Sequence, residues 1–217
     1  MDFSLAVIGF CVGSVVGMTG VGGGSLMTPI LVLGFGIKPA IAVGTDLLYA
    51  AITKSTGVFV HQKHGNIQWR IVGLLSLGSV PATLVSILFI KRLDNAGINY
   101  DNLIMTTLSI ALILTALFLV LREPLKKISS TEKFTAIKLA HRKLRNPMAP
   151  FSSVGAGVIG AAFLFFLYPR QKTIQIVATD LAHAIPITAI AGLGHAHIGT
   201  VDYTLLLNLI IGSLPGI

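Results

Sequence analysis

Long apolar blocks, separated by short polar or glycine-rich stretches, occupy most of the chain. The first block, Phe3 to Ile37, contains no charged residue. As one straight helix its 35 residues would extend roughly 52 Å, well beyond a hydrocarbon core of about 30 Å. The block is therefore expected to break. The glycine-rich run from Gly20 to Gly24, with Pro29 just beyond it, predicts the place, because glycine and proline both disfavour continuous helix.

Later blocks approach the length of about 20 apolar residues that a membrane-spanning helix needs. The predicted segments are Ala40–Gln62, Ile71–Ile90, Asn102–Leu121, Phe151–Tyr168 and Thr173–His197, followed by a run that begins near Val201 and is still apolar at Ile217. A full span needs more sequence than this last run contains. The second half of the chain is therefore expected to be incomplete.

One segment departs from the apolar pattern. Eight of the sixteen Lys and Arg residues lie between Arg122 and Arg145, opposed only by Glu123 and Glu132. Lys and Arg in loops near span ends are retained in the cytoplasm, so residues 122–150 are predicted to form a cytoplasmic connector. The net charge of +8 is concentrated there and lacks the aromatic stacking platform of a nucleic-acid surface, so no nucleic-acid partner is expected.

Composition supports lipid as the solvent. Only 11% of residues are charged and 53% are hydrophobic, whereas a soluble domain has about 25% charged residues. An ordinary soluble enzyme is excluded. The single cysteine, Cys11, excludes an internal disulfide and a CxxC site. The N-terminus lacks the basic region of a signal peptide, so the first segment is expected to be retained.

The two halves of the chain resemble each other. A shift of 134 residues aligns Thr45-Asp46-Leu47 with Thr179-Asp180-Leu181 and His61 with His195, giving ten identities over the 40 positions from Gly44 to Thr83. Internal duplication of this kind is typical of secondary transporters. The pattern predicts an all-α polytopic membrane protein with two homologous repeats, 1–121 and 151–217, each with a glycine-rich broken segment. Whether the repeats are parallel or inverted is left open.

Asp46 and Asp180 occupy equivalent positions inside apolar blocks. A carboxylate in a membrane segment costs about 2.5–3.5 kcal/mol on insertion scales, so it persists where it faces a polar cavity or a partner. Each aspartate also follows a threonine near the start of its block. The alternative is therefore a pair of helix N-caps at the membrane interface.

Other titratable residues lie in the same blocks. His183 is three residues after Asp180, on nearly the same helix face, and a carboxylate beside an imidazole can pass a proton. His61 and His195 are each followed four residues later by glycine, which favours a histidine at the water interface over a proton relay. Lys54 either extends to the interface or binds an anion.

The glycine clusters do not match nucleotide-binding motifs. No lysine follows Gly24 as a P-loop requires, and Ser25 occupies the last position of a would-be GxGxxG. Zinc spacing, GxSxG and HExxH are also absent from the sequence, so no metal, cofactor or catalytic residue is predicted. The glycines instead serve either close helix packing or an unwound segment whose N–H groups attract an anion, and the oversized first block favours the second.

Several short motifs together resemble the TauE/SafE family of sulfite exporters. They are Gly20–Pro29, Ala42–Leu47, Gly65–Arg70, Ser153–Gly157, Phe166–Pro169, Gly192–His195 and Gly199–Tyr203. The resemblance covers nearly the whole chain apart from the basic connector. It implies a multi-pass permease of the inner (plasma) membrane that moves sulfite or small organosulfonate anions, commonly outward.

The combined hypothesis is a secondary active permease for a small sulfur oxyanion, embedded in the lipid bilayer. A homo-oligomer is compatible with it. The expected substrate-binding residues are Gly20, Gly22, Gly23, Gly24, Thr45, Asp46, Gly155, Gly157, Thr179 and Asp180. Residues expected in proton coupling or gating are His183, His61, His195 and Lys54. The alternatives are an intramembrane enzyme or binding protein that uses Asp180 and His183, and a structural membrane subunit.

Overall fold

The computed structural model describes residues 8–14, 24–129, 164, 168 and 171–213. Within these ranges the regular structure is entirely helical, as the sequence predicts. Residues 8–14 are helical. The elements that follow are α2 (Gly24–Pro29), the π-helix η1 (Ile30–Gly34), α3 (Pro39–Lys63), α4 (Trp69–Asn95), α5 (Asp101–Ser129), α8 (Thr173–Ile198) and α9 (Tyr203–Ser213).

The helix boundaries mostly follow the predicted segments. α3 and α8 each begin and end within one residue of the expected range. α5 is the exception, because it continues eight residues past Leu121 to Ser129. The start of the basic segment is therefore helical. The remainder of the predicted connector, and most of Phe151–Tyr168, lie outside the described residues.

The chain downstream of the first glycine run changes helix type at a proline. α2 begins at Gly24 and contains Pro29, and the next turn is the π-helix η1. Proline has no N–H and its ring clashes with the carbonyl four residues earlier, so the ladder widens locally into a π-turn. The turn ends before Gly36, whose φ of +64° is readily adopted by glycine.

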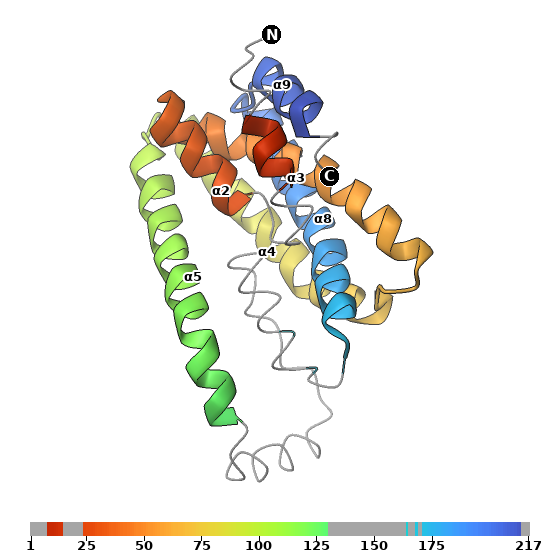
Figure 1. Cartoon of the computed structure of the whole chain (residues 1–217). Coiled ribbons are helices and arrows are strands. Elements are labelled where there is room, and N and C mark those ends of the chain that lie inside the picture. Colours follow the sequence, from red (N-terminus) through yellow and green to blue (C-terminus); the bar gives the residue numbers. More distant parts are fainter. Residues whose placement is uncertain (1–7, 15–23, 130–163, 165–167, 169–170, 214–217) are drawn as a thin grey trace.

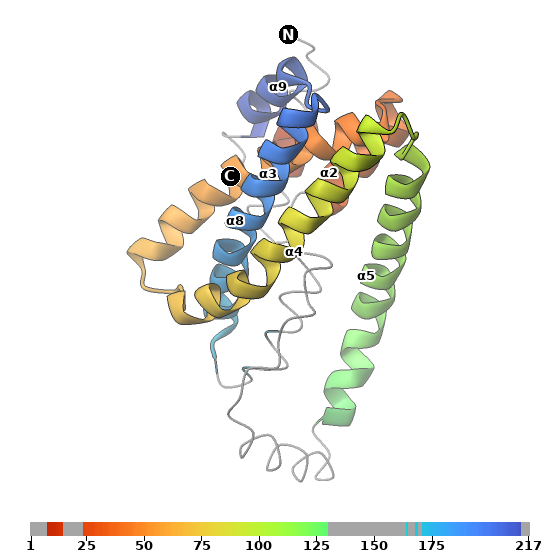
Figure 2. The ribbon, with the colours of Figure 1, turned by 180° about the vertical axis from the view of Figure 1, so that it is seen from behind.

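α3 and α8 form the centre of the molecule, and their mutual interface is the most extensive between any two described helices. α4 packs against α8, while α9 packs against the start of α3 (Figure 1). Seen from behind, α8 lies between α3 and α4, and α5 lies at the outer edge (Figure 2). Any side chain at the α3–α8 interface is therefore shielded by neighbouring helices.

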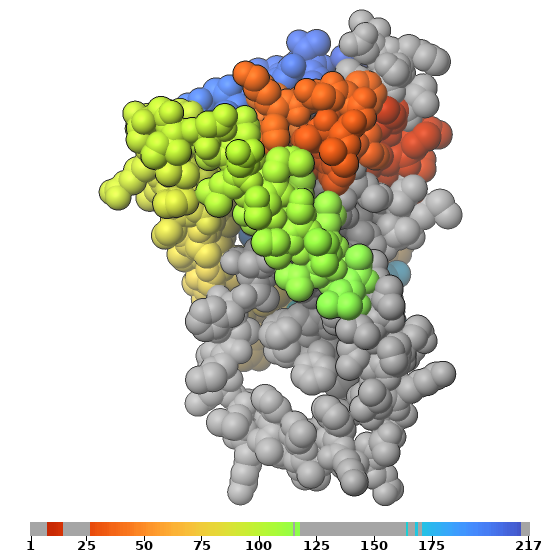
Figure 3. Space-filling view, turned by 90° about the vertical axis from the view of Figure 1, so that its left-hand side faces the viewer, coloured from red at the N-terminus to blue at the C-terminus, as the bar shows by residue number. Residues whose placement is uncertain are grey.

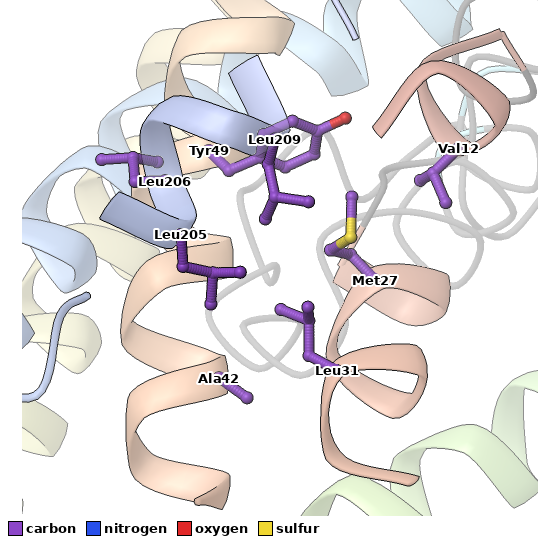
Figure 4. Close-up of a cluster of buried hydrophobic side chains, with 8 residues drawn as sticks. All are labelled: Val12, Met27, Leu31, Ala42, Tyr49, Leu205, Leu206 and Leu209. Carbon is purple, nitrogen blue, oxygen red and sulfur yellow. The ribbon is translucent and has the colours of Figure 1, made fainter. Parts of the chain in front are cut away.

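Two apolar clusters lie at opposite ends of the α3–α8 pair. In the first, side chains from four helical segments point toward one another (Figure 4). Its members are Val12, Met27, Leu31, Ala42, Tyr49, Leu205, Leu206 and Leu209. The second cluster comprises Val58, Ile67, Val72, Ala178, Leu181 and Ala182. Together they hold α3 against α9 at one end and α8 against α4 at the other.

The outer helices present large apolar side chains outward. In α4, Leu77 is 75% exposed and Val85 is 66% exposed, and in α5, Ile113 is 65% exposed. α5 covers part of one side of the molecule beside α2 and η1 (Figure 3). Such extended apolar surface is stable only against lipid or another apolar surface. Of the described helices, α4 and α8 combine the length and hydropathy needed to cross a membrane.

Candidate functional site

Asp46 and Asp180 lie deep in the interior, on the two central helices. Each is the eighth residue of its helix, α3 or α8, and each is 4% exposed. The residues at the N-caps are Lys38 and Lys172 instead. The N-cap alternative for the aspartates is therefore wrong, because both carboxyl groups lie two turns inside a helix whose neighbours cover them.

Asp46 is held by a residue of α2. The Thr28 hydroxyl donates a hydrogen bond of 2.5 Å to Asp46 Oδ2, and both side chains are buried. The second carboxyl oxygen, Oδ1, is buried without a hydrogen-bond partner. A buried polar atom left unpaired normally reflects an unmodelled water, ion or functional role. Because Thr28 follows the glycine-rich run by four residues, this bond connects that segment to the acid.

Lys54 lies between the two acids. Its side chain is 4% exposed, and its ammonium interacts electrostatically with both Asp180 and Asp46. Neither carboxylate lies within the 4.0 Å of an ion pair with it. The interpretation that Lys54 extends to the membrane interface is wrong, since α8 and α3 bury it. The anion-binding interpretation stays a prediction.

His183 faces α4 rather than Asp180. Its Nε2 lies 2.9 Å from the Ser79 hydroxyl, which also lies 3.0 Å from the Leu75 carbonyl oxygen. A hydroxyl has one proton to donate. Because Ser79 donates it to Leu75, His183 Nε2 is the donor in the shorter bond. No hydrogen bond joins Asp180 to His183, so the acid–imidazole pair of the enzyme hypothesis is not assembled.

The two other candidate histidines lie at helix ends. His195 is 3% exposed, and its Nδ1 lies 2.8 Å from the Thr200 hydroxyl. The expectation of an interfacial histidine is therefore wrong for His195, which is enclosed by the turn that ends α8. His61 lies at the end of α3 and is partly exposed, which agrees with that expectation.

The ends of α3 and α8 have the same geometry at aligned positions. Gly65 and Gly199 both have positive φ, +65° and +85°. The residue after each glycine donates its N–H to the carbonyl of the aligned histidine, Asn66 to His61 at 3.1 Å and Thr200 to His195 at 3.0 Å. This pattern is the Schellman motif.

The contacts between the two halves are reciprocal. The Gln68 N–H donates to the Thr179 hydroxyl at 3.1 Å, and the Asp202 N–H donates to the Thr45 hydroxyl at 3.0 Å. These are the same bond with the two halves exchanged, since each residue aligns with its counterpart at a shift of 134. Exchange of this kind defines an interface with two-fold symmetry.

A weaker pair follows the same exchange. His183 bonds to Ser79, and the aligned Tyr49 hydroxyl faces Ser213 without reaching hydrogen-bond geometry. The contacts also show that α3 and α8 are antiparallel, because Leu48 lies against Gly192 while Gln68 reaches Thr179. In such a pair, equivalent positions meet near Thr53 and Ile187, one residue from Lys54.

Thr45 and Thr179 therefore act in packing between the halves, and Asp46 and Asp180 follow them into the interior. Gly24 begins α2 as part of a helix. The other candidate glycines, Gly20, Gly22, Gly23, Gly155 and Gly157, lie outside the described residues. A small hollow lined by Gln68, Gln175 and Thr179 among others lies beside the start of α8. Across the described ranges, no three His, Cys, Asp or Glu side chains gather as a metal site.

Thr28 and Ser79 were not identified from sequence. Both are single hydroxyl residues in apolar blocks, a common feature that has no spacing signal of its own. Ser79 does align with Ser213 in the repeat, which was the available clue. Thr28 directly precedes Pro29, and nothing in that local pattern connects it to Asp46, 18 residues away.

Comparison with known proteins places the geometry in context. Residues 5–217 match the family described as "Sulfite exporter TauE/SafE". The chain is 34% identical to the "Probable membrane transporter protein YjnA" of Bacillus subtilis (strain 168), over all of this chain and 88% of the relative. It is 28% identical to the "Probable membrane transporter protein YdhB" of the same organism, covering 98% of this chain and 86% of the relative.

A more distant relative comes from an archaeon. The "Probable membrane transporter protein MJ0441" of Methanocaldococcus jannaschii is 28% identical over 87% of this chain and 70% of the relative. No solved structure matches the chain.

Proposed function

The chain belongs to the TauE/SafE sulfite exporter family, and on that premise we propose that it is a multi-pass, secondary active permease for sulfite or a small organosulfonate anion. Its relatives are named as membrane transporters, so its location in a membrane follows. The inner (plasma) membrane, outward transport and a sulfur oxyanion substrate are part of the proposal.

The observation that supports a transport site is the buried charge cluster at the α3–α8 crossing. Asp46, Lys54 and Asp180 are each 4% exposed, and ionisable side chains in membrane segments mark substrate or ion pathways by default. The cluster lies where two aligned helices meet, which is where transporters built from repeats bind substrate. The glycine-rich segments are proposed to supply backbone N–H groups to the anion, with Thr28 connecting the first to Asp46.

The permease is tested by reconstitution. In proteoliposomes containing the purified protein, uptake of radiolabelled sulfite or methanesulfonate should exceed that of protein-free liposomes and should saturate. Asp46→Asn and Asp180→Asn should each lower the rate at least threefold, because each removes a charge from the cluster. A correctly inserted protein that moves neither anion would favour the structural-subunit alternative, and unaffected rates in both variants would reject the proposed site.

We also propose that the two repeats are inverted, related by an axis in the membrane plane. The antiparallel contacts of α3 and α8 and their reciprocal hydrogen bonds support this arrangement. Aligned positions should then lie on opposite sides of the membrane.

Lys63 and His197 test the inversion, because they are aligned and both exposed. In a Cys11→Ala background, Lys63→Cys and His197→Cys should react with a membrane-impermeant maleimide from opposite sides of intact cells. One should be labelled directly and the other only after permeabilisation. Labelling of both from the same side would show parallel repeats.

A further inference from the structure

We propose that Lys54 is the countercharge for one monovalent oxyanion, and that each anion crosses the membrane together with one proton taken up by the Asp46–Asp180 pair. The inference rests on the proposed permease function and adds to it a substrate charge and a coupling ratio. It follows from the burial of three ionisable groups at one helix crossing.

The first step concerns the number of charges. With every group ionised, the two carboxylates and one ammonium have a net charge of −1. Net charge in a low-dielectric interior is costly, because each unpaired ion loses its hydration. The empty site is neutral when one of the two carboxyl groups holds a proton.

The unpaired oxygen of Asp46 supports a protonated carboxyl. Asp46 Oδ1 is buried and has no hydrogen-bond partner, while Oδ2 receives the Thr28 hydroxyl proton. A fully ionised carboxylate at this site would leave one oxygen without any donor, at a cost that a bound proton or a bound ligand removes. An additional occupant of the site is therefore expected in at least part of the transport cycle.

Other groups around Lys54 do not supply the missing charge. From α8 it is faced by Asp180 and His183, and His183 interacts electrostatically with Lys54 while donating Nε2–H to Ser79. Asp101 of α5 is engaged at the start of α3, where it accepts the Ala40 N–H. From α2 comes only the neutral Thr28, and His195 lies at the far end of α8. The α9 side chain facing α3 is that of the neutral Ser213.

The loaded site is neutral in a different way. A monovalent anion balances Lys54, so both carboxyl groups must then be protonated. Going from empty to loaded therefore adds one anion and one proton, bound to Asp46 or Asp180, and the site never changes net charge. The position of Lys54 beside the crossing point gives both acids access to the same ammonium from opposite ends.

The same count limits the substrate. A dianion such as sulfate would leave a net charge of −1 at the site even with both acids protonated. The site should therefore prefer monoanions, including hydrogensulfite and alkylsulfonates. Because charge and proton move together, the transport step should be electroneutral.

The test uses the full-length protein in proteoliposomes with radiolabelled methanesulfonate, a permanent monoanion, or sulfite if methanesulfonate is not moved. A pH dye inside the vesicles counts protons, and potassium with valinomycin sets the membrane potential. We expect one proton per anion, acceleration at least fivefold by a pH gradient, no effect of the potential, and sulfate moved at least tenfold more slowly. In Asp46→Asn/Asp180→Asn, any remaining flux should respond to the potential and not to the pH gradient.

The outcomes separate this inference from the function on which it rests. Anion flux that follows the membrane potential without proton movement in the unmodified protein would overturn the coupling, while leaving the permease intact. Sulfate transport as fast as methanesulfonate transport would overturn the single-countercharge site. Absence of flux for both methanesulfonate and sulfite would reject the permease itself and this inference with it.

Discussion

Replacing Lys54 by methionine should reduce anion flux at least tenfold. Methionine retains an unbranched chain of similar length but removes the buried positive charge of the cluster. Truncating one partner of a buried charge pair costs about 2–5 kcal/mol, and 1.4 kcal/mol corresponds to a factor of ten. The same loss follows in the proposed transport cycle, because the anion would enter a site that has acids but no cation. The measurement is initial uptake in proteoliposomes at equal protein density.

Two further variants make this result specific. Lys63→Met makes the same substitution on the same helix, but at an exposed lysine that lies over the Phe59 ring, and it should transport normally. Lys54→Arg keeps the charge and should retain more flux than Lys54→Met. Normal flux in Lys54→Met would exclude a role for this charge in transport. A Lys54→Met protein that elutes as a single symmetric peak in detergent would show that its loss of flux is not a loss of fold.

The helix boundaries were predictable because charge, glycine and proline mark them locally. Lys38-Pro39 begins α3, and the aligned Lys172 precedes α8. Gly65 and Gly199 follow the ends of these helices in the left-handed conformation that glycine tolerates best. α5 was predicted too short, because the first basic residue was taken as its end. Basic side chains are good helix formers and do not stop a helix that has already left the membrane.

The site was predictable in its members but not in its contacts. The shift of 134 residues selected Asp46 and Asp180 from the sequence, and the structure confirms that both are buried. The partnership of Thr28 with Asp46, and of Ser79 with His183, could not be predicted, since each bond joins residues from different helices. Likewise, the glycine after His195 correctly indicated a turn, but not that the turn is itself covered by α3.

The close approach of α3 to the end of α8 has a direct consequence for stability. Gly44 has no side chain, and a Cβ at this position would collide with the backbone carbonyl oxygen of Thr200 and come within 3.0 Å of His195 Cβ. The clash involves backbone, so a rotamer change cannot relieve it. Small residues at helix interfaces in membranes permit this kind of backbone approach. The Thr45–Asp202 hydrogen bond next to it depends on the same spacing.

Gly44→Ala should therefore lower the free energy of unfolding by about 1–3 kcal/mol, the usual cost of overpacking a well-packed interior, and should lower flux with it. The matched control is Gly57→Ala on the same helix, where a Cβ meets no atom within 4 Å. Because alanine is the better helix former by up to about 1 kcal/mol, the control should be as stable as the parent protein or more so. Thermal unfolding in detergent, followed by size-exclusion chromatography, measures both. Equal stability of the two variants would show that α3 and the turn after α8 are not held at this distance, and with them the spacing that brings Asp46 toward Lys54 and Asp180.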